Sequence, residues 1–448
     1  MAKLVIVAPY YEIATYLWNP FLRGWVKREL EKRGAGTILL WADDARRDKL
    51  FDAVKDPDAR GVLGAMHGWE EGIVGQYNWV LLRVGDSIGP EWKKLCFAPV
   101  SCLVGQKLVP WLVEQGIPAG IGEVTEYWFT AEKMQHQGDD PNEDALMKYY
   151  LLAEYTFWYR LAEGFTAGEA YRMMIREYLR QAALAKQVDE ETAYYVSYDA
   201  QNRKFFGDPD FRIREGVETE VQYSVHVEVN HRERTDTVVV HGAVVTEKGY
   251  VSGGRVKVIV NDEKQEVELS QDGTFKAALT FKWERNERRE YDVQIIYEGN
   301  LARGYLPRYV ETKVVVEPTT VPTKLEIAEI LTERSGPVVT FRVYGKLVDA
   351  KEQPVPDREV EVVVGDGELR RAYTRTNTYG VFAAKLEKSF PPLQMKAIVT
   401  AKFRGDDMYQ GSEDSKVAEF PPNWDVIWTV LGAIAIVAAA VALLLLLL

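Results

Sequence analysis

Two short apolar runs in the first quarter of the chain constrain its fold most strongly. Val62–Met66 is followed by His67, and Cys96–Val100 is followed by Ser101 and Cys102. Short apolar runs bounded by glycine are typical of buried strands in a parallel sheet. Because active sites collect at the carboxyl ends of such strands, we expect the histidine and the cysteine to meet at one sheet edge.

Strand and helix patterns alternate through residues 1–213. After Cys102 the apolar residues change to helical spacing, and this helix is predicted to end at Gly116. The other expected strands and helices are, in chain order, Leu4–Ala8, Tyr16–Leu30, Thr37–Trp41, Leu50–Val54, Ile117–Ile121, Glu143–Ala162 and Ala167–Lys186. This order predicts an α/β domain with a doubly wound, mostly parallel sheet.

A histidine and a cysteine at neighbouring strand ends are typical of nucleophilic catalysis. A cysteine attacks as its thiolate, so it needs a nearby base or a lowered pKa. His67 can take the proton of Cys102 and later return it to the leaving group. We also expect Cys102 to open the following helix, whose dipole would stabilise a thiolate. The alternative is structural, with Cys102 a small buried apolar residue and His67 simply hydrogen-bonded.

The other cysteine, Cys96, has a different expected role. It precedes Cys102 by six positions, which is about 20 Å along an extended strand. Cys96 is therefore predicted to pack in the core.

The two strand ends resemble those of a known peptidase group. An apolar strand ending in His67-Gly68, followed by one ending in Ser101-Cys102, resembles the caspase-like cysteine peptidases, and among them the gingipain-type and CHAT-type members most closely. Gly207-Asp208-Pro209 is similar to the segment that often closes such domains. The resemblance covers residues 1–213. Pro99 departs from it, because a proline removes a ladder hydrogen bond.

The resemblance implies a cysteine endopeptidase with a caspase-like α/β domain. Cys102 would be the nucleophile, and His67 would act as general base and then general acid. The backbone N–H groups of Gly68 and Cys102 would form the oxyanion hole. Glu70 or Glu71, close to His67 in the sequence, could orient the imidazole.

The resemblance also directs attention to the segment after the strand that follows the cysteine helix, where these families build part of the substrate cleft. This chain has Glu123, Glu126, Tyr127 and Trp128 there. Acidic groups in that place would favour a basic residue before the scissile bond. The alternative is a solvated loop with an aromatic side chain in the core.

A cluster of acidic residues near position 140 is a candidate metal site. Its members are Asp139, Asp140, Asn142, Glu143 and Asp144. Such oxygen-bearing side chains can bind Ca²⁺, so Asp139 and Asp140 are candidate ligands. The competing interpretation is a helix N-cap at Asp140 with acidic residues in the first turn. His136 is expected in an exposed loop. Catalysis by the Cys–His pair requires no cofactor.

Residues 214–318 and 322–419 have the alternating patterns and turn signals of β-sandwiches. They also correspond to each other. Gly242 corresponds to Gly345, Gly273-Thr274-Phe275 to Gly380-Val381-Phe382, and Tyr297-Glu298-Gly299 to Phe403-Arg404-Gly405. The last pair of segments, followed by Tyr305 or Tyr409, resembles a late strand and turn of bacterial and archaeal Ig-like modules.

The C-terminal run Val426–Leu448 carries no charge. As a helix it spans about 34 Å, which is enough to cross the hydrocarbon core of a bilayer. Trp424 and Trp428 lie where an interfacial aromatic belt is expected. We therefore expect a single-pass anchor. The start of the chain has no signal-peptide pattern, so a tail-anchored protein on the cytoplasmic side is the simpler expectation, and a cell-surface protein is the alternative.

The sequence thus predicts a membrane-anchored cysteine endopeptidase that acts on a protein or peptide substrate. Its parts are a caspase-like domain (1–213), two Ig-like sandwiches (214–318 and 322–419) and a transmembrane helix (424–448). The alternative is a catalytically inactive interaction, scaffold or cell-surface protein with the same fold. A net charge of −12 opposes nucleic-acid binding. Two cysteines beside many Glu, Lys and Arg residues would also fit a thermophile.

Overall fold

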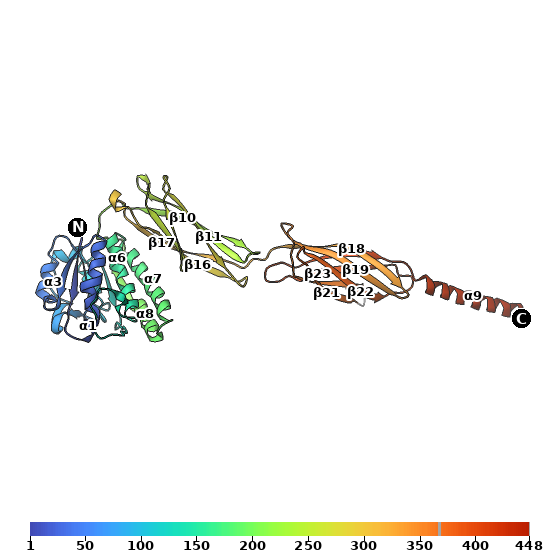
Figure 1. Ribbon diagram of the computed structural model, residues 1–448, viewed down its shortest axis with the longest axis horizontal. Helices are drawn as coiled ribbons and strands as arrows, with labels where there is room; N and C mark the ends of the chain where they lie inside the picture. Colours follow the sequence, from blue (N-terminus) through green and yellow to red (C-terminus); the bar gives the residue numbers. More distant parts are fainter. Residues whose placement is uncertain (366–368, 448) are drawn as a thin grey trace. The chain divides into compact units, whose positions relative to one another are not determined.

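The computed structural model describes residues 1–365 and 369–447 (Figure 1). The chain divides into two compact units, and the division runs through the first β-rich region. One unit comprises Met1–His226, Val239–Leu279 and Asp292–Lys313, and the other comprises Val227–Val238, Thr280–Tyr291 and Val314–Leu448.

A six-stranded mixed sheet organises the N-terminal α/β region, with strand order β2-β1-β3-β7-β8-β9. The strands are β1 (Lys3–Ala8), β2 (Gly36–Trp41), β3 (Ala59–Gly64), β7 (Cys96–Phe97), β8 (Ala119–Glu123) and β9 (Arg203–Gly207). Neighbouring strands are parallel except β8 and β9, which are antiparallel. The predicted α/β class with a mostly parallel sheet is confirmed, whereas the antiparallel edge strand was not predicted.

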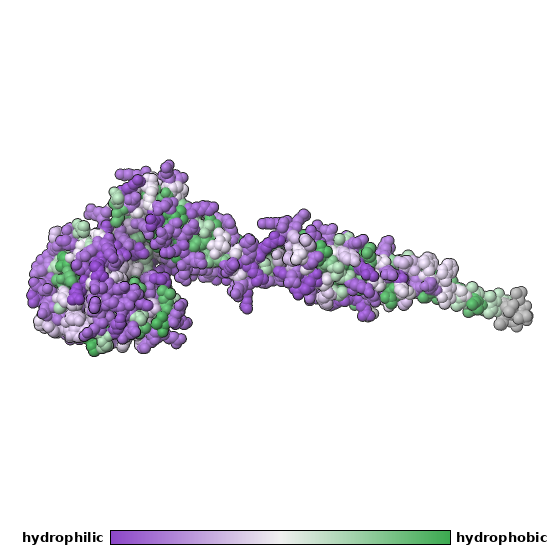
Figure 2. Space-filling model, in the orientation of Figure 1, coloured by the Kyte–Doolittle hydropathy of each residue, from purple (hydrophilic) through white to green (hydrophobic). Residues whose placement is uncertain are grey.

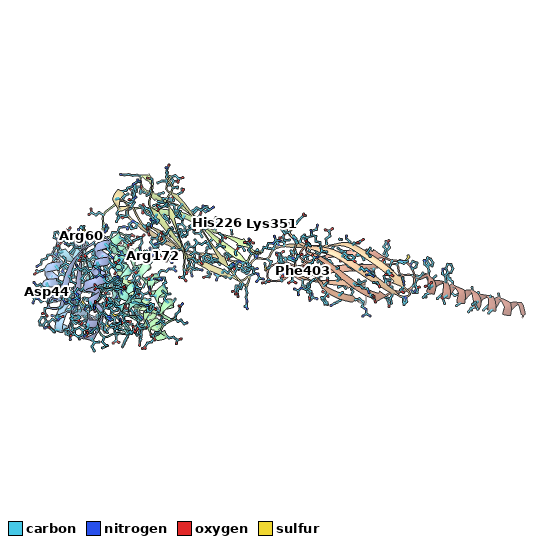
Figure 3. The ribbon with its side chains drawn as sticks, viewed as in Figure 1. Asp44, Arg60, Arg172, His226, Lys351 and Phe403 are labelled. Carbon is cyan, nitrogen blue, oxygen red and sulfur yellow. The ribbon has the colours of Figure 1, made fainter. Side chains whose placement is uncertain are left out.

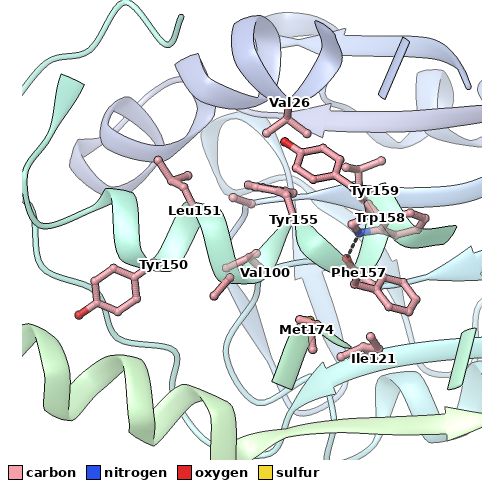
Figure 4. Close-up of a cluster of buried hydrophobic side chains, with 14 of the residues drawn as sticks. Val26, Val100, Ile121, Tyr150, Leu151, Tyr155, Phe157, Trp158, Tyr159 and Met174 are labelled. Atoms are coloured by element: carbon pink, nitrogen blue, oxygen red, sulfur yellow. Dashed lines mark hydrogen bonds between the residues drawn. The ribbon is translucent and has the colours of Figure 1, made fainter. Parts of the chain in front are cut away.

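Helices cover both faces of this sheet. One face carries α1 (Ile13–Phe21), α2 (Lys27–Lys32), α5 (Lys148–Glu154), α6 (Thr156–Glu163), α7 (Ala167–Ala185) and α8 (Glu190–Asn202), and the other carries α3 (Arg47–Ala53) and α4 (Leu108–Glu114). Because side chains alternate along a strand, Ile6 packs in the first core and Val5 in the second. Figure 4 shows part of the first core, where Trp158 Nε1 donates to Ala98 O at 3.3 Å.

Three helical regions differ in detail from the prediction, and one of them is the helix expected over Glu143–Ala162, which forms the separate helices α5 and α6. The helix expected over Tyr16–Leu30 is interrupted by a π-helical turn at Leu22–Val26, two residues after Pro20, which lies inside α1. Proline and π turns are common causes of helix irregularity. The helix α8 was not predicted.

A small antiparallel sheet follows β3 directly. It consists of β4 (Gly68–Trp69), β5 (Gly72–Val74) and β6 (Val80–Arg83), in that order. The sequence analysis did not predict it. Its first strand begins at the residue after His67, so it fixes the backbone on that side of the histidine.

The two β-rich regions each contain two antiparallel sheets. The first has β10-β11-β12 with β15 on β11, and β14-β13-β16-β17; the second has β18-β19-β22 and β21-β20-β23-β24. The strands are β10 (Glu220–Asn230), β11 (Thr235–Thr246), β12 (Gly249–Tyr250), β13 (Arg255–Val260), β14 (Glu263–Glu268), β15 (Thr274–Lys282), β16 (Arg289–Tyr297), β17 (Arg308–Val316), β18 (Thr323–Ser335), β19 (Val338–Asp349), β20 (Glu359–Val364), β21 (Arg370–Arg375), β22 (Val381–Ser389), β23 (Lys396–Phe403) and β24 (Ser412–Glu419). His226 lies on β10 (Figure 3), and its ring stacks on that of His241 with 5.5 Å between ring centroids.

The predicted correspondence between the two regions is confirmed at a glycine–phenylalanine contact. A Cβ atom at Gly242 would lie 2.5 Å from Cζ of Phe275, and one at Gly345 would lie 2.3 Å from Cζ of Phe382. Both distances are too short for a side chain. The same ring therefore covers the same bare backbone in each region.

The C-terminal helix α9 comprises Trp424–Leu447. Its portion Trp424–Ala442 has a mean hydropathy of 2.2 and is long and apolar enough to cross a membrane. Figure 2 colours most of its described surface pale to green, with little purple. Leu448, the last residue of the predicted span, lies outside the described residues.

Candidate active site

The third and seventh strands stay paired beyond their assigned ends. A parallel bridge joins Ala65 to Val100. The N–H of Val100 donates to Gly64 O at 2.8 Å, and the N–H of Met66 donates to Val100 O at 3.1 Å. His67 and Cys102 each follow this bridge by two residues. The register therefore places them at the same level of the sheet edge, on neighbouring chains.

Pro99 is compatible with this strand end. In a parallel ladder, alternate residues bond to opposite neighbours. The N–H groups of Ala98 and Val100 both donate to the β3 side, so the nitrogen of Pro99 faces β8. Pairing of β7 with β8 ends at Phe97. The proline thus ends the pairing with one neighbour and leaves the pairing with the other intact.

His67 and Cys102 line one cavity of about 90 Å³. The remaining lining residues are Ala14, Thr15, Trp18, Ala65, Met66, Val100, Ser101, Tyr127 and Phe129. The cavity lies within the α/β region, at the carboxyl ends of β3 and β7. The two residues that the sequence singled out therefore line the same cavity.

Gly68 contacts the cysteine segment closely. A Cβ atom on it would lie 2.2 Å from Ser101 Oγ and 3.0 Å from Cys102 O. Val74 N–H donates to His67 O at 3.0 Å, so the pair formed by Gly68 and Ile73 is of the type without mutual hydrogen bonds. The N–H of Gly68 consequently points away from β5.

The imidazole of His67 has a carboxylate partner that the sequence analysis missed. His67 Nε2 lies 3.2 Å from Glu12 Oε1. The same carboxylate accepts the N–H groups of Ala14 and Thr15 at 3.0 and 2.8 Å, as the N-cap of α1. Glu12 is therefore fixed by the helix it caps. With Nε2 directed at Glu12, Nδ1 is the ring nitrogen that remains for another partner.

Glu70 and Glu71, named from the sequence as candidates to orient His67, pair with Lys107 instead. Lys107 Nζ lies 3.0 Å from a Glu70 carboxylate oxygen and 2.9 Å from one of Glu71. Both carboxylates thus lie over the turn that precedes α4. The prediction is wrong because the chain turns into β4 immediately after the histidine.

The environment of Cys102 does not favour a thiolate. Burial raises the pKa of its thiol, and the negative charges of Glu126 and Glu123 act in the same direction. The N–H of Tyr127, which donates to Sγ at 3.4 Å, opposes this shift. The protein therefore holds Cys102 as a neutral thiol at neutral pH.

The expected helix dipole at Cys102 is also absent, because the chain forms turns there and α4 begins only at Leu108. The end of this helix is as predicted, with Gly116 in the left-handed region at φ +100°. Leu103 N–H donates to Thr125 O at 2.9 Å, and Leu103 itself has φ +64°. The turn is thus held by the segment after β8.

Cys96, in contrast, is fully buried in the core, and burial strongly raises the pKa of its thiol. Its predicted packing role is confirmed.

Glu123, predicted to bind substrate, is instead fully buried in an ion-pair cluster. Its carboxylate lies 3.2 Å from Arg203 Nη1, and Arg203 also pairs with Glu154. Asp199 is fully buried nearby and raises the pKa of its neighbours. Burial raises the pKa of Glu123 to about 8, against the opposing charge of Arg203. We call Glu123, Glu154, Asp199 and Arg203 the acid cluster.

The other residues of that segment divide between the surface and the cavity. Glu126 is exposed. Trp128 is 46% exposed and stacks on Tyr195 at 5.8 Å between ring centroids. The lining of the cavity includes neither of them and instead includes Tyr127 and Phe129. Of the residues named in this segment from the sequence, Tyr127 therefore lines the cavity, whereas Glu126 and Trp128 do not.

The acidic residues near position 140 are engaged in local structure. Asp140 Oδ1 accepts Asn142 N–H at 2.8 Å and caps the short helix Pro141–Glu143, so the capping interpretation is confirmed. Asp139 pairs with Arg28 at 2.6 Å. Within the described residues, no group of three His, Cys, Asp or Glu side chains is arranged to hold a metal ion.

His136 was expected to be exposed, but this is wrong. Its side chain is buried, because its ring packs on Phe21 with 4.9 Å between centroids.

Fold and site together define a multidomain protein. An α/β region carries a cavity lined by a cysteine and a histidine at the edge of a mixed sheet, and β-rich regions and an apolar helix follow. No family model and no curated protein matches the chain.

Several solved structures match the chain. They include a complex of the pro- and mature domains of RgpB from Porphyromonas gingivalis, with 11% identity, 69% of this chain and 67% of that chain covered, and a TM-score of 0.31. A 1.5-MDa bacterial ice-binding adhesin matches with 13% identity over 46% of this chain and 65% of that one, at a TM-score of 0.22. Invasin, a bacterial integrin-binding protein, matches with 16% identity over 45% of this chain and 39% of that one, at a TM-score of 0.24. The matched regions span less than two thirds of the adhesin and invasin chains.

Proposed function

We propose that the α/β region is the catalytic domain of a caspase-like cysteine endopeptidase, and that the two β-rich regions are Ig-like modules. The observation that carries the proposal is that His67 and Cys102 line one cavity, at the ends of strands that stay in register up to that point. The contact between Glu12 and Nε2 of His67 supports it, because that contact leaves Nδ1 for the cysteine. The domain limits proposed from the sequence, 1–213, 214–318 and 322–419, are retained.

The proposed reaction begins with a neutral thiol. Nδ1 of His67 removes the proton of Cys102 as Sγ attacks the carbonyl carbon of the scissile bond. The carbonyl oxygen becomes an oxyanion, which the N–H groups of Gly68 and Cys102 stabilise. The C–N bond then breaks, and the leaving amine takes the proton from the imidazolium. A thioester joins Cys102 to the acyl part of the substrate.

Water completes the cycle. His67 takes a proton from the water as its oxygen attacks the thioester carbon. The C–S bond breaks, the carboxylic acid product leaves, and the proton on His67 returns to the sulfur. Glu12 acts as a positioning residue throughout, since it holds one ring nitrogen and stabilises the imidazolium that forms.

The test is hydrolysis of a mixed peptide library by the full chain in detergent, followed by mass spectrometry. We expect cleavage that is lost in Cys102→Ala and in His67→Ala and retained in the matched control Cys96→Ala. If all three variants and the unaltered chain leave the library intact, the α/β region serves as a binding or scaffold domain. The raised pKa of the Cys102 thiol is the observation that favours this second function.

We also propose that α9 anchors the chain in a bilayer. Flotation of the full chain with liposomes, compared with a chain lacking residues 424–448, tests this. We expect only the full chain to float. Protease accessibility in sealed cells then decides between the cytoplasmic and the cell-surface side.

A further inference from the structure

The wall of the cavity is formed mainly by hydrocarbon. Trp18 lies at its centre, with ring centroids 5.2 Å from Phe129 and 5.6 Å from Tyr127. The backbone side is formed by Ala65 and Val100, both of which are almost fully buried. The three aromatic rings come from α1 and from the segment after β8, so two separate parts of the chain build one apolar surface.

The polar atoms of these wall residues are bonded elsewhere. Trp18 Nε1 donates to Tyr155 OH at 2.5 Å, and Tyr127 OH lies 3.0 Å from Tyr178 OH in the core. The hydroxyl of Thr15 donates to the carbonyl of Glu12 at 2.9 Å. Each of these polar groups has a hydrogen-bond partner within the protein. The surface that these residues present to the cavity is therefore mainly carbon.

The wall also lacks charge. Among the described lining residues there is no aspartate, glutamate, lysine or arginine. Glu126, which is adjacent to Tyr127 in the sequence, is exposed, and Glu123 is fully buried and paired with Arg203. Glu12 is held by His67 and by the cap of α1. A charged side chain in this cavity would be buried without a partner, which is strongly unfavourable.

One polar group in the lining remains without a partner. Ser101 Oγ is buried and makes no hydrogen bond within the described part of the chain. It lies next to the backbone of Gly68. An occupant that is apolar and has one hydrogen-bond acceptor beside its apolar part, as an amino-acid residue in a peptide has, would satisfy it.

We propose that this cavity receives an apolar side chain of the polypeptide substrate, at the residue whose carbonyl carbon Cys102 attacks. The assignment rests on the proposed peptidase function. It gives the substrate an apolar residue before the scissile bond, where acidic groups at Glu123 and Glu126 would have favoured a basic one. The cavity wall of alanine, valine and aromatic carbon is suited to an aliphatic side chain such as that of valine or leucine.

The first experiment measures kcat/KM of the full chain on peptides that differ only at the residue before the scissile bond. We expect the highest values for valine, leucine and methionine. Arginine, lysine, aspartate and glutamate should be at least about 100-fold lower, because their charge would be buried unpaired. Cleavage that depends on Cys102 but follows arginine, lysine or an acidic residue overturns this inference and leaves the proposed peptidase intact. Absence of any Cys102-dependent cleavage overturns both.

The second experiment adds a charge to the wall. Ala14 lines the cavity in the first turn of α1, where an acidic residue is tolerated. Ala14→Asp should raise the ratio of kcat/KM for lysine over leucine about tenfold. Ile13→Asp is the matched control, since Ile13 is the adjacent residue, is 59% exposed and is not part of the lining. Equal ratios in the two variants would place the substrate side chain outside this cavity.

Discussion

Two parts of the α/β region, the cavity beside Cys102 and the acid cluster, differ in where their polar groups lie. The cavity beside Cys102 is lined by aromatic carbon, and the polar atoms of its wall are bonded away from it. The acid cluster, in contrast, gathers three carboxylates around one arginine in a fully buried place. Tyr127 links the two, because its ring lines the cavity while its hydroxyl reaches Tyr178, which bonds to Glu154. The comparison teaches that an acid near an active-site loop can be purely structural.

The largest effect is expected from removing the only cation of the acid cluster. Arg203→Met leaves Glu123 and Glu154 without the guanidinium that both contact, and we expect the free energy of unfolding to fall by about 3–5 kcal/mol. Urea denaturation of the full chain in detergent measures it. Arg28→Met is the control, because the pair of Arg28 with Asp139 is exposed and should contribute less than about 1 kcal/mol. Equal losses would mean that the cluster does not stabilise the fold.

Substitution of Glu12 and of Glu123 distinguishes a residue that positions His67 from one that only stabilises the fold. Glu12→Gln should lower kcat about tenfold, or about 1.4 kcal/mol, with little change in KM, because the imidazolium loses its carboxylate partner. Glu123→Gln should leave kcat and KM within about twofold, since Glu123 lies outside the cavity. Steady-state kinetics on one peptide measures both. A larger kinetic effect from Glu123→Gln than from Glu12→Gln would reverse the two assignments.

The raised pKa of Glu123 predicts a pH dependence of stability. The folded state keeps the proton of Glu123 up to about pH 8, whereas the unfolded state loses it near the ordinary value of 4.5. The folded state thus binds more protons between these values, so this contribution to stability is full below pH 4.5 and is lost as the pH rises through 8. Urea midpoints should decline over this range, and less steeply in Glu123→Gln. Parallel pH profiles would contradict the assignment.

The smallest effect concerns the resting thiol. Because burial raises the pKa of Cys102, iodoacetamide should label it more slowly at pH 7 than it labels a free exposed thiol, and labelling should speed up as the pH rises past 9. Cys96, fully buried, should stay unlabelled in the folded protein. Peptide mapping by mass spectrometry follows both sites. Rapid labelling of Cys102 at pH 6 would instead indicate a thiolate that exists before substrate binds.

The sequence predicted those features that depend on local pattern. The strands before His67 and Cys102, the helix end at Gly116 and the burial of Cys96 follow from apolar runs and glycine positions. The correspondence of Gly242 with Gly345 follows from repetition of the sequence. In each case the information lies within a few residues, or recurs along the chain.

The missed features depend on contacts between distant segments. Glu12 reaches His67 because β1 and β3 are parallel neighbours, which brings their carboxyl ends together. Glu123 contacts Arg203, which arrives on the antiparallel strand β9. Neither pairing has a local signature. A carboxylate that caps a helix soon after a strand was the one signal that could have pointed to Glu12.

The central claim is that Nδ1 of His67 activates Cys102 toward a peptide carbonyl. The most direct measurement is mass spectrometry of the full chain after rapid quenching with a leucyl p-nitroanilide peptide. We expect the acyl mass on the peptide that contains Cys102, formed with one equivalent of p-nitroaniline and absent in His67→Ala. Release of p-nitroaniline without this adduct, or an equal adduct in His67→Ala, would contradict the account.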